Sequence, residues 1–184
     1  LDRVHADIVL LLNPDTRLSG GTLSLCVEEL RVRPEVGVLT PRIVKATGEF
    51  DRRCMRGFPT LWAVACHLTR ADRLLRDHRS LRYTQGWLRD DVTAEVEAVS
   101  GAVMFCRARA LRAVGGFDER FFMYGEDIDL CLRVRAGGWK VVFWPGATIT
   151  HIGGGAGSNS RSRAAWARSI GDIHRIHRPG VAGR

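Results

Sequence analysis

The sequence predicts an α/β fold in which a mixed sheet carries helices on both of its faces. Residues 8–12 form an uninterrupted run of large aliphatic side chains, as expected of a buried strand. Strand-like and helix-like segments then alternate along the chain, and glycine pairs at 115–116 and 137–138 end two of the helical segments. The sequence has no internal repeat. We therefore expect these strands and helices to build one layered domain.

The N-terminal half contains two strand-like segments and one clear helix. Leu23, Val27 and Leu30 lie on one helical face, and Pro34 ends that helix. Asn13-Pro14-Asp15-Thr16 has the composition of a turn and ends the first strand. The expected elements are a fully buried strand at 7–12, a helix at 20–32, a strand at 36–43, and short helices near 61–77 inside a loop-rich insertion at 48–95.

The C-terminal half is more regular. Its expected elements are strands at 99–106, 141–144 and 148–152 and helices at 107–114, 126–136 and 162–177. Pro145-Gly146 is expected to form a turn between the last two strands, and a Gly/Ser-rich stretch at 153–160 precedes the last helix. The chain thus divides into a main domain at 1–160 and a basic amphipathic helical tail at 161–184.

Composition limits the class of protein but does not choose a partner. The chain has 184 residues, 45% of them hydrophobic, a net charge of +8 and a pI of about 10.1. A basic surface attracts phosphates of any kind, yet no known nucleic-acid motif appears, so no specific nucleic-acid partner is expected. No apolar run approaches the length of about 18 residues that a membrane span needs. The sequence has five cysteines without a close pairing, namely Cys26, Cys54, Cys66, Cys106 and Cys131. They predict reduced core thiols in a cytoplasmic protein.

Asn13-Pro14-Asp15 comes directly after the first strand, where open α/β sheets bind ligands. A lone carboxylate at such a position can hold a divalent metal, which in turn can hold a diphosphate. The alternative is that Asp15 is a turn former or a helix cap. His151 ends a later strand, before a glycine run that is neither a Walker loop nor G-x-G-x-x-G. By itself, a histidine such as His151 is more often a hydrogen-bonded polar residue than a metal ligand.

Three acids open the helix at 126–136, where the helix dipole alone would favour them. Asp127 shares a helical stripe with Cys131 and Val134 and is therefore expected to face inward, where a general base would lie. Asp129 precedes Arg133 by four residues and is expected to form a surface ion pair. Glu126 has the position of a helix-capping residue.

Several motifs together resemble the family-2 inverting glycosyltransferases, and rhamnosyltransferase-like members in particular. Leu11-Leu12-Asn13-Pro14-Asp15 is similar to the L-N-P-D form of that family's D-x-D element. The similarity covers about residues 1–160 and continues, in the family's order and at similar spacings, through Ser100-Gly101-Ala102, residues 115–119, residues 121–130, Arg133, Gly137-Gly138-Trp139, Pro145 and His151.

The resemblance implies a GT-A fold and a role for each matching residue. Asp15 is expected to reach the metal–diphosphate, Asp127 to be the catalytic base and His151 to be a second metal ligand. Asn13 and Gly101 are expected beside Asp15 in the donor site, with Glu126 and Trp139 on the acceptor side.

The implied reaction is a single, inverting displacement. A nucleotide-diphospho-sugar would be the donor, with deoxythymidine-diphospho-rhamnose favoured over a uridine-diphospho-sugar. The acceptor would be a glycan or a polyprenyl-linked sugar, and Mg²⁺ or Mn²⁺ the cofactor. No Q-x-x-R-W segment follows the acidic block, which points away from a processive synthase.

Two departures from the family pattern affect these expectations. Asn13 stands at the first acid position of the D-x-D element, so metal binding would rest on Asp15 and His151. The family's first βαβ unit should precede residue 1, so the chain is expected to be N-terminally truncated. An inactive pseudo-enzyme and a basic nucleic-acid-binding module are the alternative functions.

The tail at 162–178 allows two interpretations. Its apolar stripe of Trp166, Ile170, Ile173 and Ile176 is flanked by basic residues, with Asp172 as the only acid. Such a helix can lie in a membrane interface, which would bring the protein to the inner face of the membrane and to a lipid-linked acceptor. Alternatively, the stripe packs against the domain and the flanking arginines are merely solvated.

Overall fold

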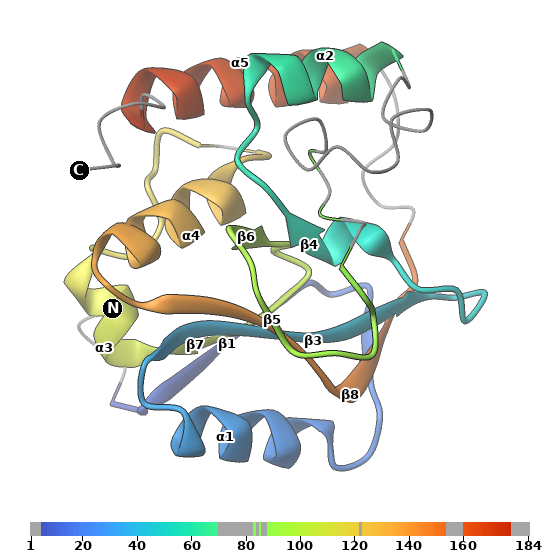
Figure 1. The fold of residues 1–184 in the computed structure, drawn as a ribbon, viewed down its shortest axis with the longest axis vertical. Coiled ribbons are helices and arrows are strands. Elements are labelled where there is room, and N and C mark those ends of the chain that lie inside the picture. The colour runs from blue at the N-terminus through green and yellow to red at the C-terminus, as the bar shows by residue number, and fades with distance from the viewer. Residues whose placement is uncertain are drawn as a thin grey trace.

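A six-stranded mixed sheet forms the centre of the molecule (Figure 1). The computed structural model describes residues 5–69, 83, 85, 88–121, 123–153 and 160–177. Strands β3 and β8 pair in parallel, and the other described pairs are antiparallel, so the predicted mixed sheet is confirmed. The strand order is β1 (Ile8–Leu12), β7 (Val103–Arg107), β3 (Val36–Lys45), β8 (Lys140–His151) and β2 (Thr16–Leu18), with β5 (Ala94–Glu95) also paired to β8.

Helices cover both faces of this sheet, also as predicted. One face carries α1 (Thr22–Val32), while α4 (Glu126–Ala136) covers the other, with α3 (Ala108–Ala113) at one end. Beyond α4 lies a further layer that consists of α2 (Leu61–Thr69) and α5 (Ser160–His177). A small hairpin of β4 (Met55–Arg56) and β6 (Ala98–Val99), which follows the 3-10 turn at Arg52–Cys54, lies between the sheet and this outer layer.

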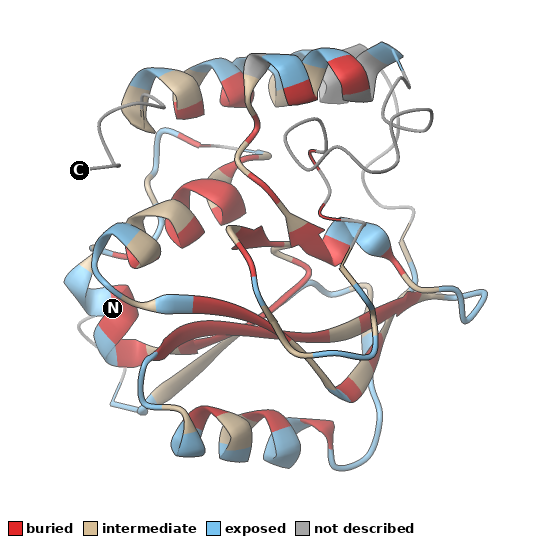
Figure 2. Ribbon diagram, viewed as in Figure 1, coloured by how far each residue is buried: buried red, intermediate tan, exposed pale blue. Residues whose placement is uncertain are grey.

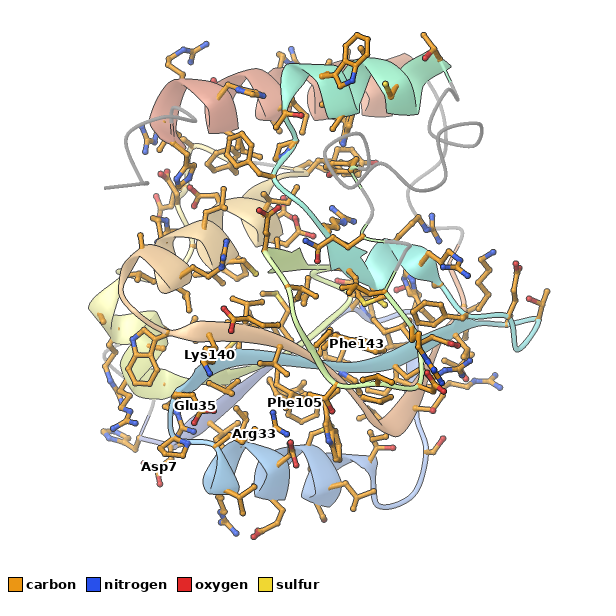
Figure 3. All side chains as sticks on the ribbon, in the orientation of Figure 1. Asp7, Arg33, Glu35, Phe105, Lys140 and Phe143 are labelled. Atoms are coloured by element: carbon orange, nitrogen blue, oxygen red, sulfur yellow. The ribbon has the colours of Figure 1, made fainter. Side chains whose placement is uncertain are left out.

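The core lies in the two layers on either side of the central strands (Figure 2). Phe105 of β7 and Phe143 of β8 are fully buried within it (Figure 3). All five cysteines are buried and free, as predicted for core thiols. No helix among the described residues is long and apolar enough to cross a membrane.

The first strand is less buried than predicted. Residues of β1 are only partly covered, and Leu12 is 41% exposed. β1 pairs with β7 on one side and has no described strand on the other, and this edge position leaves it accessible. The predicted face of α1 is only partly right: Leu30 is buried, but Leu23 is 51% exposed, and Thr22 and Cys26 complete the buried stripe.

Two predicted strand boundaries also differ. The segments at 141–144 and 148–152 belong to one strand, β8, which stays paired with β3 across the Pro-Gly step. The register passes from Trp144 directly to Thr148, so the intervening residues form a bulge and not a turn. The strand predicted at 99–106 is split into β6 and β7, and Ser100-Gly101-Ala102 forms the break between them.

The helical tail packs against the domain. Ile170 and Ile173 are 5% and 0% exposed within the core cluster, and Trp166 and Ile176 pack against it. The apolar stripe is therefore occupied by the protein's own core, which is the packing alternative and not the membrane one. Residues 70–77, Phe122, 154–159 and 178–184 of the sequence predictions lie outside the described residues.

Candidate functional site

A cleft of about 490 Å³ opens where β1 and β8 end and α4 begins. Residues that are far apart in the chain meet there because the sheet brings these strand ends beside the hairpin of β4 and β6. The lining residues are Asn13, Pro14, Asp15, Arg53, Arg56, Ser100, Gly101, Ala102, Tyr124, Glu126, Asp127, His151 and Gly153. The cleft therefore contains all of the sequence-predicted site residues except Trp139.

Asp127 lies in the first turn of α4 and is 5% exposed. Its Oδ2 accepts a hydrogen bond of 2.8 Å from the backbone N–H of Gly101, and Oδ1 accepts one of 2.9 Å from the N–H of Ile128. Arg56 Nη1 lies 3.3 Å from Oδ2. The predicted inward stripe is confirmed, since Cys131 and Val134 are both fully buried. A buried carboxylate that lines a cleft and is held in one orientation by hydrogen bonds can act as a general base.

Gly125 explains why α4 begins at this place. It has a φ of 87°, which an L side chain rarely adopts, and it allows the chain to turn sharply into the helix. A Cβ at this position would lie 3.1 Å from Ser169 Cβ and 3.2 Å from Ile173 Cδ1 of α5. Ser169 Oγ also donates a 3.1 Å hydrogen bond to the carbonyl oxygen of Met123. Helix α5 thus holds the loop that positions Asp127.

Glu126 also lines the cleft, next to Asp127. Its Oε2 is buried and has no hydrogen-bond partner within the described residues. Burial raises the pKa of Glu126, and the neighbouring charge of Asp127 raises it further. Because the residue lines the cleft, its carboxylate is a candidate acceptor for a hydroxyl group of a ligand.

Asp129 pairs with Arg133 as its spacing predicted, but the pair does not lie on the surface. The residue is 0% exposed, because α4 lies between the sheet and α5 and so is buried on two sides. Arg133 donates to Asp129 Oδ2 from Nε at 2.8 Å and from Nη2 at 2.6 Å, while His177 Nε2 lies 2.8 Å from Oδ1. Burial would raise the pKa of Asp129, but the hydrogen bonds from His177 and Arg133 outweigh it and lower the pKa.

Asp15 and His151 meet because β2 pairs with β8 in a register that sets Thr16 opposite His151. Thr16 closes the preceding turn through a 2.7 Å hydrogen bond from its Oγ1 to the carbonyl oxygen of Asn13. His151 Nε2 lies 3.2 Å from Asp15 Oδ1, yet this buried oxygen has no partner in hydrogen-bond geometry. Asn13 is tied to the other side of the cleft, since its N–H donates to the carbonyl oxygen of Ala102 at 2.9 Å.

This pair fits a divalent cation as part of a ligand set. A carboxylate oxygen without a hydrogen bond and an imidazole nitrogen face each other. Carboxylate oxygens bind Mg²⁺ or Mn²⁺, and imidazole nitrogens bind transition-metal ions, of which Mn²⁺ is one. No group of three or more His, Cys, Asp or Glu side chains among the described residues could hold a metal. The remaining ligands would have to come from a diphosphate or from water.

Trp139 does not line this cleft, and its acceptor-side role stays a prediction. The Arg109 guanidinium lies over its ring at 4.7 Å, and its side chain approaches the backbone of Gly37. Three further residues line the cleft that the sequence patterns did not predict as site residues: Arg53, Arg56 and Tyr124. The two arginines belong to the loop-rich insertion at 48–95, which has no periodic pattern, so only the fold reveals their position.

Comparison with solved structures identifies the class of fold. A crystal structure of GalNAc-T7 with UDP, GalNAc and Mn²⁺ resembles the chain with a TM-score of 0.57 at 13% identity, over 92% of this chain and 31% of that one. This likeness shows the GT-A fold. The model of glycosyl transferase family group 2 matches residues 8–173. The chain belongs to that family.

Two curated relatives are rhamnosyltransferases by name. The N-acetylglucosaminyl-diphospho-decaprenol L-rhamnosyltransferase of Mycobacterium tuberculosis (strain ATCC 25618 / H37Rv) is 32% identical over 145 residues, which cover 79% of this chain and 47% of the relative. Rhamnosyltransferase WbbL of Escherichia coli (strain K12) is 39% identical over 56 residues, 30% of this chain and 21% of the relative. The chain spans about half the length of the first of these relatives.

Proposed function

We propose that the protein transfers a sugar, with rhamnose favoured, from a nucleotide-diphospho-sugar to a hydroxyl group of a glycan or lipid-linked acceptor. One observation carries this proposal. The cleft combines a buried acid, Asp127, with a carboxylate–imidazole pair, Asp15 and His151, on its other side. The first group suits removal of a proton, and the pair suits a metal–diphosphate.

The proposed reaction is a single displacement that inverts the anomeric carbon. The acceptor oxygen forms a bond to that carbon as the bond to the diphosphate oxygen breaks, and Asp127 takes the proton of the acceptor hydroxyl. Such a base contributes about 10²–10⁴-fold to the rate. Asp15 and His151 would hold Mg²⁺ or Mn²⁺, which supplies positive charge for the leaving diphosphate. The inversion is inferred from this direct attack, since a single displacement leaves no glycosyl-enzyme intermediate.

Further residues of the cleft would orient the two substrates. Asn13 and Gly101 line the cleft with Asp15 and Asp127 and would bind the donor. Glu126 would accept a hydrogen bond from the acceptor through its unpaired Oε2. The choice of rhamnose and of a lipid-linked acceptor is supported by the names of the relatives alone.

A transfer assay with purified intact protein tests this proposal. Deoxythymidine-diphospho-rhamnose and uridine-diphospho-sugars would be offered with Mn²⁺ or Mg²⁺ to a polyprenyl-diphospho-N-acetylglucosamine acceptor, and products analysed by mass spectrometry and NMR. We expect rhamnose transfer with an inverted anomeric centre, abolished by chelation. A retained configuration would refute the mechanism. If no donor is consumed and none binds, the inactive pseudo-enzyme is the correct alternative, whereas salt-sensitive nucleic-acid binding would favour the binding module.

A further inference from the structure

We infer that Arg56 is a positioning residue for Asp127, holding the carboxylate of the proposed base ionised and correctly oriented. This inference rests on the proposed function, because it assigns Asp127 the role of base. The contact is direct: Arg56 Nη1 lies 3.3 Å from Asp127 Oδ2, and the two side chains are 20% and 7% exposed. A pair so shielded from solvent interacts more strongly than a surface ion pair.

The structure fixes the Arg56 guanidinium independently of Asp127. Arg56 belongs to β4, where it pairs with Ala98 of β6. Its Nε donates a 3.2 Å hydrogen bond to the carbonyl oxygen of Arg53, and its Nη1 lies 3.4 Å from Tyr83 Oη. The guanidinium also lies over the Tyr83 ring at 5.8 Å. Arg56 is therefore pre-placed, and Asp127 is oriented against it.

Tyr83 extends this support to the outer helical layer. Its side chain is 6% exposed and packs edge-on against Trp166 of α5, with 5.9 Å between ring centroids. A chain of contacts thus runs from α5 through Tyr83 and Arg56 to Asp127. The same helix holds the backbone before α4 through Ser169. Helix α5 therefore supports the proposed base from two directions.

The electrostatics explain why a cation is needed at this place. Glu126 and Asp127 are adjacent carboxylates at the start of α4, and the pKa of Glu126 is raised by burial and then by the charge of Asp127. Arg56 interacts with both acids. Burial acts to lower the pKa of Arg56, but the charge of Asp127 and smaller contributions of Tyr83 and Glu126 outweigh burial, so this pKa is raised. Cys131, one helical turn below, has a pKa raised by burial to about 12 and stays neutral.

Without Arg56, the adjacent buried carboxylates of Glu126 and Asp127 would have no cation in contact with Asp127 among the described residues. Adjacent like charges disfavour joint ionisation, so the charged form of Asp127 would lose the stabilisation that the cation provides. A protonated Asp127 cannot act as a base. Arg53 also lines the cleft, but its guanidinium is bound to Asp51 at 2.7 Å and its side chain is 64% exposed, so it is no substitute.

The test compares Arg56→Met, which keeps the bulk and removes the charge, with Arg56→Lys, which keeps the charge. Asp127 is active as a base only when it is deprotonated, and this requirement sets the direction in which the pH profile shifts. Losing the cation should therefore move the acid limb of the kcat profile to higher pH, by about one pH unit or more. Arg56→Lys should move it less, and KM for the donor should change less than about threefold in both variants. Arg89→Met, at a 74% exposed surface pair, is the matched control and should leave the profile unchanged.

A second variant separates charge from packing. Glu126→Gln removes the like charge, so the acid limb should shift less on Arg56→Met in the Glu126→Gln background than in the wild type. A uniform loss of kcat at every pH, with an unmoved limb, would overturn the inference and leave Arg56 a merely structural role. A large rise in donor KM with an unmoved limb would also overturn it and place Arg56 on the diphosphate.

A titration that needs no turnover distinguishes this inference from the proposed function. The carboxyl ¹³C signal of Asp127, assigned by its loss in Asp127→Asn, would be followed by NMR against pH in wild type and Arg56→Met. An upward move of the midpoint supports the inference even if no sugar is transferred. An unchanged midpoint refutes it even if the enzyme is fully active.

Discussion

His177 Nε2 lies 2.8 Å from Asp129 Oδ1 and joins the last turn of α5 to the first turns of α4. Arg133 occupies the other carboxylate oxygen and also donates a 2.6 Å hydrogen bond to the carbonyl oxygen of Val114 beyond α3. A single buried acid thereby connects three helical segments. Because Asp127 lies two residues away on α4, this connection fixes the orientation of the helix that carries the proposed base.

We expect Asp129→Asn to destabilise the protein by about 3 kcal/mol, since it removes the buried charge that pairs with Arg133 and contacts His177. Urea unfolding at neutral pH measures this loss. Asp91→Asn is the matched control, because Asp91 is 60% exposed in its pair with Arg89 and should change the unfolding free energy far less. Equal effects of the two variants would show that Asp129 behaves as a surface residue.

The stability that Asp129 provides should depend on pH in one direction. Its pKa is lowered in the folded protein, so the folded state favours the ionised form. The contribution is then fully present above the unfolded pKa of about 3.9 and is lost as the pH falls through the folded value. The difference in unfolding free energy between wild type and Asp129→Asn should therefore shrink as the pH falls below about 4. A difference that grows on acidification would contradict this sign.

Gly125→Ala should cost more stability than Gly138→Ala. Both glycines have positive φ, 87° and 83°, so the backbone strain of about 1–2 kcal/mol is shared. Only at Gly125 would the added Cβ meet Ser169 and Ile173, whereas nothing lies within 4 Å of a Cβ at Gly138. The loss of unfolding free energy should be larger for Gly125→Ala than for Gly138→Ala by more than about 1 kcal/mol, measured by thermal or urea unfolding. Equal costs would mean that α5 does not press against this loop.

Asp15→Ala should weaken the binding of a nucleoside diphosphate in the presence of Mn²⁺ by about tenfold or more, and His151→Ala by less. The reason is that these residues supply the two ligating atoms that face each other in the cleft. Calorimetric titration with and without Mn²⁺ measures the effect, with exposed Glu119→Ala as control. Metal-independent binding that is unchanged in Asp15→Ala would remove the metal from the proposal.

Local patterns predicted those parts of the structure whose determinants lie close together in the chain. The bounds of α4 agree with the predicted helix at 126–136 because Gly125 and Gly137 delimit it in sequence. The inward position of Asp127 followed from its spacing to Cys131. The face of α1 was predicted only in part: Leu30 is buried as expected, but Leu23 is exposed and Cys26 is buried, because the packing of α1 on the sheet decides which side of the helix is covered.

Features that depend on distant partners were not predictable. Asp129 has an obvious partner four residues away, but its burial is caused by α5, whose His177 lies 48 residues further along the chain. Arg56 falls in a segment without periodicity and reaches Asp127 only through the hairpin of β4 and β6. Trp139 contacts Arg109, which lies 30 residues earlier in the chain, and this contact could not be read from its own motif.

The role of Asp127 is tested most directly by Asp127→Asn in the intact protein, which keeps the shape of the side chain and removes its basicity. We expect kcat to fall at least about 100-fold, because a general base contributes at least that factor, while the dissociation constant of the donor changes less than about threefold. Asp91→Asn should keep wild-type kcat. If Asp127→Asn retained more than about a tenth of the wild-type kcat, Asp127 would not be the base.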